Sequence, residues 1–139
     1  MDNAMDAPTT PLPMTTKLRI AARVWLSFLR VVLRDPREPL PQFVARLGRV
    51  APQRTERIAP IRLKGAVLRI LRLGPWRPTC LANALVLYRL LHEQGDPAEL
   101  VIGLPLAARD HQAHAWVELD GQDLGPFPGR QHSALARFS

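Results

Sequence analysis

Apolar residues recur every three or four positions through the first half of the chain, which is the spacing of one face of an α-helix. This spacing predicts three helices, over residues 17–34, 40–50 and 61–73. Each segment stops at a proline signal, Asp35-Pro36, Ala51-Pro52 or Gly74-Pro75, where a helix cannot easily continue. The first half is therefore expected to be helical.

The polar residues of the first predicted helix fall at spacings of three and four, so they share one face. They are Arg19, Arg23, Ser27, Arg30 and Arg34, and the opposite face is apolar, with Ile20, Val24, Leu26, Leu29, Val31 and Leu33. We interpret the arginine face as the one exposed to solvent. Docking of an acidic peptide or of a partner protein is the alternative use of this face.

The second half begins with the clearest helix, over residues 79–94, which is apolar along almost its whole length. Thr79 is placed to act as its N-cap and Gly95 as its C-cap glycine. Two strands, 99–104 and 113–119, follow, and Asp120-Gly121 is a hairpin turn signal. Residues 122–127 should return beside the second strand, and the last ten residues are expected to be loose.

The order of helices, then a central helix and a small antiparallel sheet, predicts an α+β fold. The length of 139 residues fits one domain. We expect residues 1–15 to be a disordered tail and 16–139 to be the domain, with a helical part at 16–74 and a core at 75–128.

The net charge of +7 and the pI of about 11.2 require an anionic partner, which can be a peptide, nucleic acid or membrane surface. The single cysteine excludes an internal disulfide, and the N-terminal residues do not resemble a secretory signal. Arginines interrupt the longest apolar stretch, so no transmembrane segment is expected. A reducing cytoplasm is the expected location.

Two residues stand out as candidates for covalent chemistry. Cys80 opens the central helix, where unpaired amides and the helix dipole favour a thiolate. His114 lies on the second strand, and alternation places it on one face with Trp116 and Glu118. Taken singly, each residue is more readily explained by packing or ordinary hydrogen bonding. A cysteine at a helix start followed by a histidine on a strand is, however, the layout of papain-like and transglutaminase-like enzymes.

The segment from about residue 76 to 127 resembles the protease half of the B proteins that mature lasso peptides. The shared features are the helix-opening Cys80-Leu81, the apolar helix ending near Gly95, the strand ending in Ile102-Gly103, and His-Ala-Trp-Val-Glu at 114–118 before an Asp-Gly turn. The resemblance implies a minimal transglutaminase-like core. It also implies a cysteine peptidase, with Cys80 as the nucleophile and His114 as the general base.

The same resemblance implies a substrate and partners. Such proteins remove the leader from a ribosomally made precursor before an asparagine-synthetase-like cyclase closes the macrolactam ring. The chain offers no additional leader-binding domain, so a separate small leader-binding protein is expected as a partner. No cofactor and no metal ion are expected, and nucleic acid is not an expected partner.

The third catalytic residue departs from the family's pattern. The family usually carries an Asp about twelve residues past the histidine, where this chain has Pro126. Asp123 is the nearest acid on the returning strand, although the hairpin sets it opposite Glu118 unless a bulge shifts the register. Asp123 is our candidate, Asp120 is a weaker one, and a Cys–His dyad without an acid is the remaining alternative.

Two rival functions stay open at this stage. The first is transglutaminase or amide-transfer chemistry on the same Cys80–His114 site. The second is a basic, non-catalytic binding module for nucleic acid or membrane, which the charge favours but no nucleic-acid motif supports. His92 is assigned to the C-terminal dipole of the central helix, and Asp110 and His111 to the edge of a substrate cleft.

Overall fold

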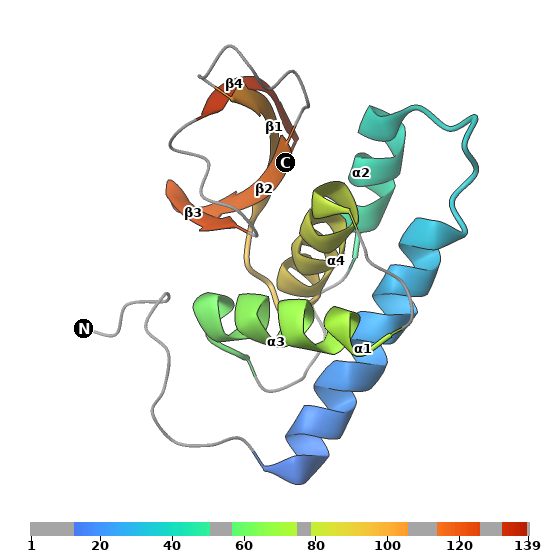
Figure 1. The fold of residues 1–139 in the computed structure, drawn as a ribbon, viewed down its shortest axis with the longest axis vertical. Helices are drawn as coiled ribbons and strands as arrows, with labels where there is room; N and C mark the ends of the chain where they lie inside the picture. The colour runs from blue at the N-terminus through green and yellow to red at the C-terminus, as the bar shows by residue number, and fades with distance from the viewer. Residues whose placement is uncertain (1–12, 51–56, 75–78, 106–113, 126–131, 139) are drawn as a thin grey trace.

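A computed structural model describes residues 13–50, 57–74, 79–105, 114–125 and 132–138. These residues form four helices and then one antiparallel sheet, which confirms the α+β expectation (Figure 1). The helices are α1 (Met14–Val32), α2 (Leu40–Gly48), α3 (Pro60–Arg72) and α4 (Cys80–Glu93). The strands are β1 (Glu99–Pro105), β2 (His114–Leu119), β3 (Gln122–Gly125) and β4 (His132–Phe138). Most of the expected disordered tail lies outside the described residues, and α1 begins at Met14.

The helix boundaries follow the local sequence signals closely. Pro13 and Pro39 directly precede α1 and α2, and Pro60 is the first residue of α3, which suits a residue with a fixed φ and no N–H to donate. At α4 the predicted cap is present: the Thr79 Oγ1 accepts a hydrogen bond from the Ala82 N–H at 3.1 Å. Gly95 follows this helix with a φ of 90°, which a glycine adopts at little cost.

The sheet has the strand order β3-β2-β1-β4, and all neighbouring strands are antiparallel. Asp120 and Gly121 have φ values of 52° and 79°, as a tight two-residue turn between β2 and β3 requires. Strand β4 corrects the expectation of a loose end, because its residues pair with β1 from Leu100 to Pro105. Its residues, HSALARF, have weak local strand signals, so the open edge of β1 determines the pairing.

Helix α4 lies at the centre of the molecule and packs against strand β2 as well as against α1, α2 and α3. Its side chains from Ala84 to Tyr88 are all buried. On β2, Ala115, Val117 and Leu119 join the same core cluster, as the alternation of the strand predicts. Trp116 points to the other side, where it is also buried and its Nε1–H donates to Glu118 Oε2 at 2.8 Å.

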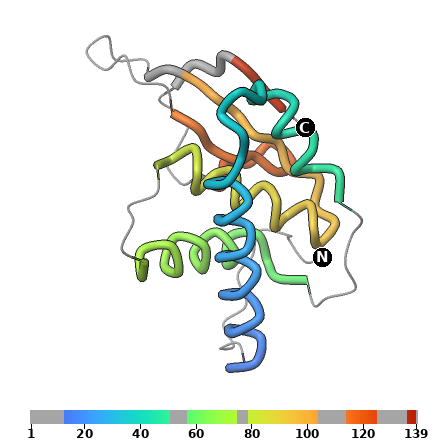
Figure 2. The backbone as a smooth tube through the Cα atoms, turned by 90° about the vertical axis from the view of Figure 1, so that its right-hand side faces the viewer, coloured from blue at the N-terminus to red at the C-terminus, as the bar shows by residue number. Residues whose placement is uncertain are grey.

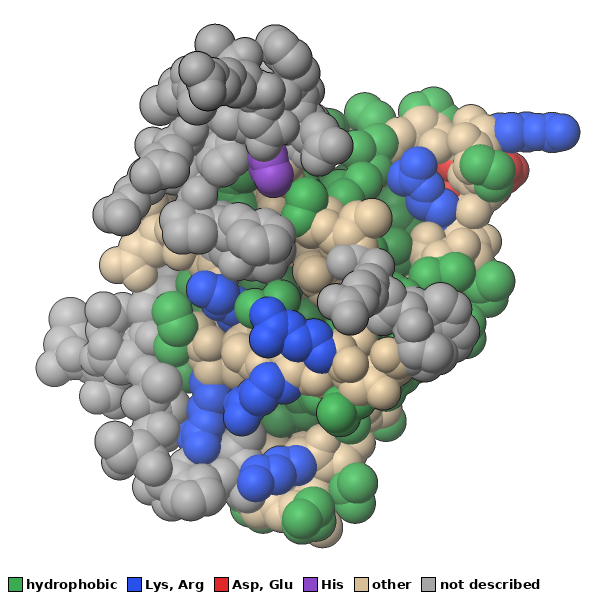
Figure 3. Space-filling view, in the orientation of Figure 1, with side chains coloured by type: hydrophobic (Ala, Val, Ile, Leu, Met, Phe, Trp, Pro, Cys, Tyr) green, Lys and Arg blue, Asp and Glu red, His purple; other side chains and the backbone are tan. Residues whose placement is uncertain are grey.

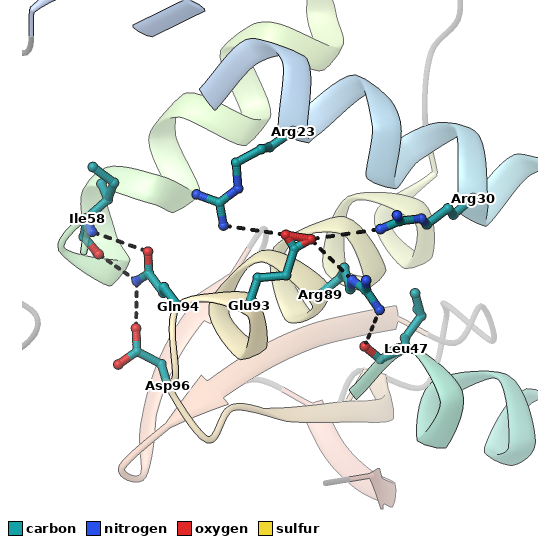
Figure 4. Close-up of polar contacts among 8 residues, drawn as sticks. All are labelled: Arg23, Arg30, Leu47, Ile58, Arg89, Glu93, Gln94 and Asp96. Atoms are coloured by element: carbon teal, nitrogen blue, oxygen red, sulfur yellow. Dashed lines mark hydrogen bonds and ion pairs between the residues drawn. The ribbon is translucent and has the colours of Figure 1, made fainter. Parts of the chain in front are cut away.

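The orientation of α1 corrects part of the interpretation of its arginine face: Arg19 is exposed and Ile20 and Val24 are buried as expected, but other positions are reversed. Ser27 is buried and the Arg23 side chain is only 13% exposed, whereas Leu29 and Leu33 are 51% and 72% exposed. The cause lies on α4, where the buried carboxylate of Glu93 needs counter-charges. Three arginines supply them: Arg23 at 3.5 Å, Arg30 at 3.9 Å and Arg89 at 3.2 Å (Figure 4).

A second polar cluster, which we call the Gln94 clamp, ties the segment before α3 to the end of α4. The Gln94 side chain accepts from the Ile58 N–H at 3.2 Å and donates to the Ile58 carbonyl at 2.7 Å (Figure 4). It also donates to Asp96 at 2.6 Å, and Asp96 in turn binds Arg57. The clamp and the Glu93 cluster therefore both lie at the C-terminal end of α4.

Candidate active site

Cys80 is the first residue of α4 and its thiol is free and half-buried. The Thr79 cap engages the Ala82 N–H through its hydroxyl, and the Asn83 N–H bonds to the Thr79 carbonyl at 3.0 Å. Helix geometry gives the amides of Cys80 and Leu81 no partner inside the helix. Two backbone donors thus lie in the same first turn as Cys80, at the positive end of the helix dipole, an arrangement suited to an anionic sulfur or oxygen.

His114 is the first residue of β2, is half-buried, and pairs with Gly103 on β1. The topology brings it to the same end of the core as Cys80. Helix α4 is ~21 Å long at 1.5 Å per residue, and β1 reverses direction after it and covers ~13 Å from Glu99 to Gly103 at 3.3 Å per residue. Figures 1 and 2 agree that α4 and β2 begin on the same side of the molecule.

Alternation along β2 fixes the side of the strand on which His114 lies. Ala115 and Val117 pack into the core with α4, so His114 shares its side with Trp116 and Glu118. Because His114 is the terminal residue of the strand, it lies at the rim of the sheet. The first residues of α4 and β2, Cys80 and His114, thus lie at one end of the α4–β2 pair, with His114 on the side of the strand opposite to Ala115 and Val117.

Asp123 lies on β3 and is exposed, and its Cα partner across the ladder is Glu118. The two-residue turn predicts this pairing of Glu118 with Asp123. The ladder becomes irregular only farther from the turn, between Val117 and Glu118. Asp123 is consequently displaced from His114 by four positions along β2, or ~13 Å at 3.3 Å per residue. The exposed Asp120 lies in the turn, still farther along. Pro126, Asp110 and His111 lie outside the described residues.

Asn83 is a further polar residue near Cys80 that the sequence interpretation did not assign to the site. It is half-buried, one turn along α4 from Cys80, and within the described part of the chain its buried Oδ1 has no hydrogen-bond partner. A buried, unsatisfied amide oxygen costs stability, so its position close to Cys80 makes Asn83 a candidate for contact with a substrate. The available signal was an Asn in an otherwise apolar stretch of helix.

His92 is explained by structure rather than chemistry. Its Nε2 lies 2.9 Å from the Ala98 carbonyl oxygen, and its ring packs against Tyr88 with the centroids 4.4 Å apart. Among the described residues, no three His, Cys, Asp or Glu side chains are grouped so that they could hold a metal ion. Over the same residues, no helix is long and apolar enough to cross a membrane.

Comparison with known protein families supports the fold described above. The profile of the transglutaminase-like superfamily matches residues 16–133, which is most of the chain. No curated protein and no solved structure matches the chain. Members of the superfamily are generally enzymes, either cysteine proteases or acyltransferases, and a cysteine that opens a helix followed by a histidine on a strand suits that chemistry. The chain therefore belongs to the transglutaminase-like superfamily.

Proposed function

We propose that the chain is a cytoplasmic cysteine peptidase that removes the leader from a ribosomally made lasso-peptide precursor. The observation that carries the proposal is the position of Cys80, at the capped N-terminus of α4 and at the same end of the core as His114. The superfamily supports a cysteine-dependent enzyme. The Cys-Leu and His-Ala-Trp-Val-Glu motifs support the narrower assignment.

The proposed reaction is acyl transfer to water. His114 takes the proton of the Cys80 thiol, and the sulfur attacks the carbonyl carbon of the scissile peptide bond. The amides of Cys80 and Leu81 stabilise the oxyanion that forms. The imidazolium then protonates the leaving nitrogen as the C–N bond breaks, and a water molecule, deprotonated by His114, hydrolyses the thioester.

Asn83 and the acids take secondary roles in this proposal. The unsatisfied Oδ1 of Asn83 is available to accept a hydrogen bond from a substrate N–H near Cys80. Asp123, our candidate third residue, lies opposite Glu118, which is four positions along β2 from His114, so the proposed chemistry rests on the dyad. Orientation of a catalytic imidazole by an acid raises the rate, but it is not indispensable.

The proposal includes two partners, a small leader-binding protein that delivers the precursor and an asparagine-synthetase-like cyclase that uses the new N-terminus. The test combines the purified chain, the leader-binding protein and the precursor, with the products analysed by mass spectrometry. We expect leader and core peptide whose masses sum to that of the precursor plus one water. Cys80→Ala and His114→Ala should abolish the products while circular dichroism shows a folded protein.

His92→Gln is the matched control, because it changes a histidine that contacts the Ala98 carbonyl rather than the site. It should retain cleavage. Full cleavage by Cys80→Ala would overturn the proposal. Transglutaminase chemistry on the same residues would instead yield a crosslinked product with the mass loss of one ammonia. Salt-sensitive DNA binding without thiol-dependent cleavage would favour the basic binding module.

A further inference from the structure

An uncovered apolar stripe runs along the full length of α1. Its members are spaced by three or four residues and all are exposed: Met14, Leu18, Ala22, Leu26, Leu29 and Leu33. Both Leu26 and Leu29 are 51% exposed and Leu18 is 63% exposed. The stripe extends over ~29 Å at 1.5 Å per residue. A continuous exposed stripe of this kind is typical of a surface that binds another molecule.

A groove of about 580 Å³ lies beside the C-terminal half of this stripe, between α1 and α2. Leu26, Leu29 and Leu33 form its apolar side, and Arg89 of α4 also lines it. This volume falls within the range of sites that accept side chains or short segments of a ligand. The stripe and the groove together form one surface, which we call the α1 surface.

The charges along the α1 surface are unbalanced. Arg30 and Arg34 line the groove, and residues 14–34 contain no acidic residue. The two acids at the groove are already engaged: Asp35 Oδ1 accepts from the Arg37 N–H at 2.9 Å, and Glu38 binds Arg46 at 2.7 Å. Lysine and arginine side chains also gather over α3 and the adjacent part of α1 (Figure 3).

Arg34 is the residue of the groove that most clearly lacks an acidic partner among the described residues. Its guanidinium lies over the Phe43 ring, 5.2 Å from the centroid, and its Nη1 is buried without a hydrogen-bond partner in the described part of the chain. A buried guanidinium nitrogen is costly unless it donates to an acceptor, and a carboxylate is the acceptor that matches its geometry best. The groove therefore fits a ligand that carries carboxylates beside apolar side chains.

The position of the groove indicates a partner protein rather than the bond to be cleaved. Cys80 and Arg89 are nine residues apart on α4, which places them half a turn apart, on opposite sides of the helix. A ligand at Arg89 thus lies across α4 from the candidate nucleophile. Pairing of two copies through this surface would bring arginine-rich faces together, and the two acids of the groove are already engaged within each copy, so a second copy of the chain is disfavoured.

We propose that the α1 surface is a docking site for an acidic amphipathic helix of a partner protein. The leucines of such a helix would pack on the stripe, as in helix-in-groove recognition, and its carboxylates would bind Arg34 and Arg30. This inference goes beyond the peptidase chemistry and does not depend on it. A partner bound here leaves the Cys80 end of α4 open to substrate.

The test measures binding of a synthetic peptide by fluorescence anisotropy. The probe is an amphipathic helix of roughly 20 residues, the length of the stripe, with leucines on one face and glutamates beside them. A second peptide carries lysines in place of the glutamates. Binding is measured with the full chain carrying Cys80→Ala as well as with the unmodified chain, so a failure of the peptidase proposal leaves the result readable.

We expect the acidic peptide to bind and the lysine peptide not to bind. Leu29→Gln and Arg34→Gln should each raise the dissociation constant at least about tenfold. Leu73→Gln and Arg72→Gln are the matched controls, because both residues are exposed at the end of α3, Leu73 to 82%. These controls should bind like the unmodified chain, and circular dichroism should show that every variant is folded.

Several results would overturn the inference. Equal binding of the lysine peptide would mean nonspecific apolar adhesion, and no binding of the acidic peptide would mean that the charge argument fails. A dimer in light scattering that Leu29→Gln dissolves would make a second copy the occupant. Binding to anionic vesicles, lost in Leu29→Gln while peptide binding is absent, would make a membrane surface the occupant.

Discussion

Glu93 offers the sharpest test of the forces that hold this fold together. Its carboxylate is buried on α4, 4% exposed, and three arginines share it. Substitution by Gln keeps the size of the side chain and removes the charge. Arg23 and Arg89, whose side chains are 13% and 14% exposed, are then left close together without the anion that balances them.

The expected loss of stability is large for a single substitution. Removing one partner from a buried ion pair costs about 3–5 kcal/mol, because the remaining charge stays buried and uncompensated. Arg30 is 43% exposed and 3.9 Å away, so solvent screens it and it adds little. Arg89 keeps its hydrogen bond to the Leu47 carbonyl, which places the expected loss near the lower value, at about 3 kcal/mol.

Urea unfolding followed by circular dichroism measures this loss. With an m-value of about 2 kcal/mol per molar urea, the midpoint should fall by roughly 1.5 M. Glu38→Gln is the matched control, because Glu38 pairs with Arg46, whose side chain is 63% exposed, and such pairs contribute under about 1 kcal/mol. If Glu93→Gln shifts the midpoint no more than Glu38→Gln does, the Glu93 cluster does not stabilise the fold.

Three further predictions follow from buried or capping polar groups. Asn83→Leu should raise the free energy of unfolding by about 1 kcal/mol, because it removes an unsatisfied buried amide, and should lower kcat/KM for leader removal at least about tenfold; a variant that is as active as the wild type would exclude Asn83 from the site. Burial raises the pKa of Tyr88 above its usual 10.0, so this tyrosine's contribution to stability is full below pH 10.0 and declines as pH rises through the folded-state pKa. Because the buried Tyr88 hydroxyl has no hydrogen-bond partner among the described residues, Tyr88→Phe should unfold at higher urea than the wild type. The margin should widen above pH 10.0, where the wild type loses stability as the tyrosine of its unfolded chain ionises, and a constant margin would contradict the assignment. Thr79→Ala should cost about 1 kcal/mol in urea unfolding through loss of the α4 cap, whereas Thr79→Ser, which keeps the hydroxyl, should cost much less; equal losses would show that the cap is not the cause.

The parts of the fold that depend on neighbouring residues could be predicted from the sequence. Helix α4 lies between its cap Thr79 and Gly95, and the β2–β3 turn needs only Asp120 and Gly121, so short-range chemistry specifies both. The pairing between Glu118 and Asp123 follows from that turn because the side-chain repeat of a strand fixes the register.

The parts that could not be predicted depend on distant residues. The buried side of α1 is decided only in part by its own residues: Ile20 and Val24 are buried as their apolar character predicts, but Arg23 lies beside them because the buried Glu93 carboxylate on another helix needs a counter-charge. Strand β4 forms because it pairs with the open edge of β1. The residues of β4 themselves carry no clear strand pattern from which this pairing could be predicted. For the candidate site, the sequence supplied Cys80 and His114 as residue types in context, but the unsatisfied Asn83 oxygen becomes evident only when the packing around it is known.

The Gln94 clamp has a consequence for how the molecule opens. The two hydrogen bonds between Gln94 and Ile58 join positions 36 residues apart and so close a long loop of the chain. The backbone amides at these two positions can exchange with solvent only when both bonds break and the loop opens. In deuterium exchange, the Ile58 N–H and the last turn of α4 should be among the slowest to exchange. The first turn of α4 lacks such a tether among the described residues, so its amides should exchange sooner. Local opening would then begin at the end where Cys80 lies, while the opposite end stays closed.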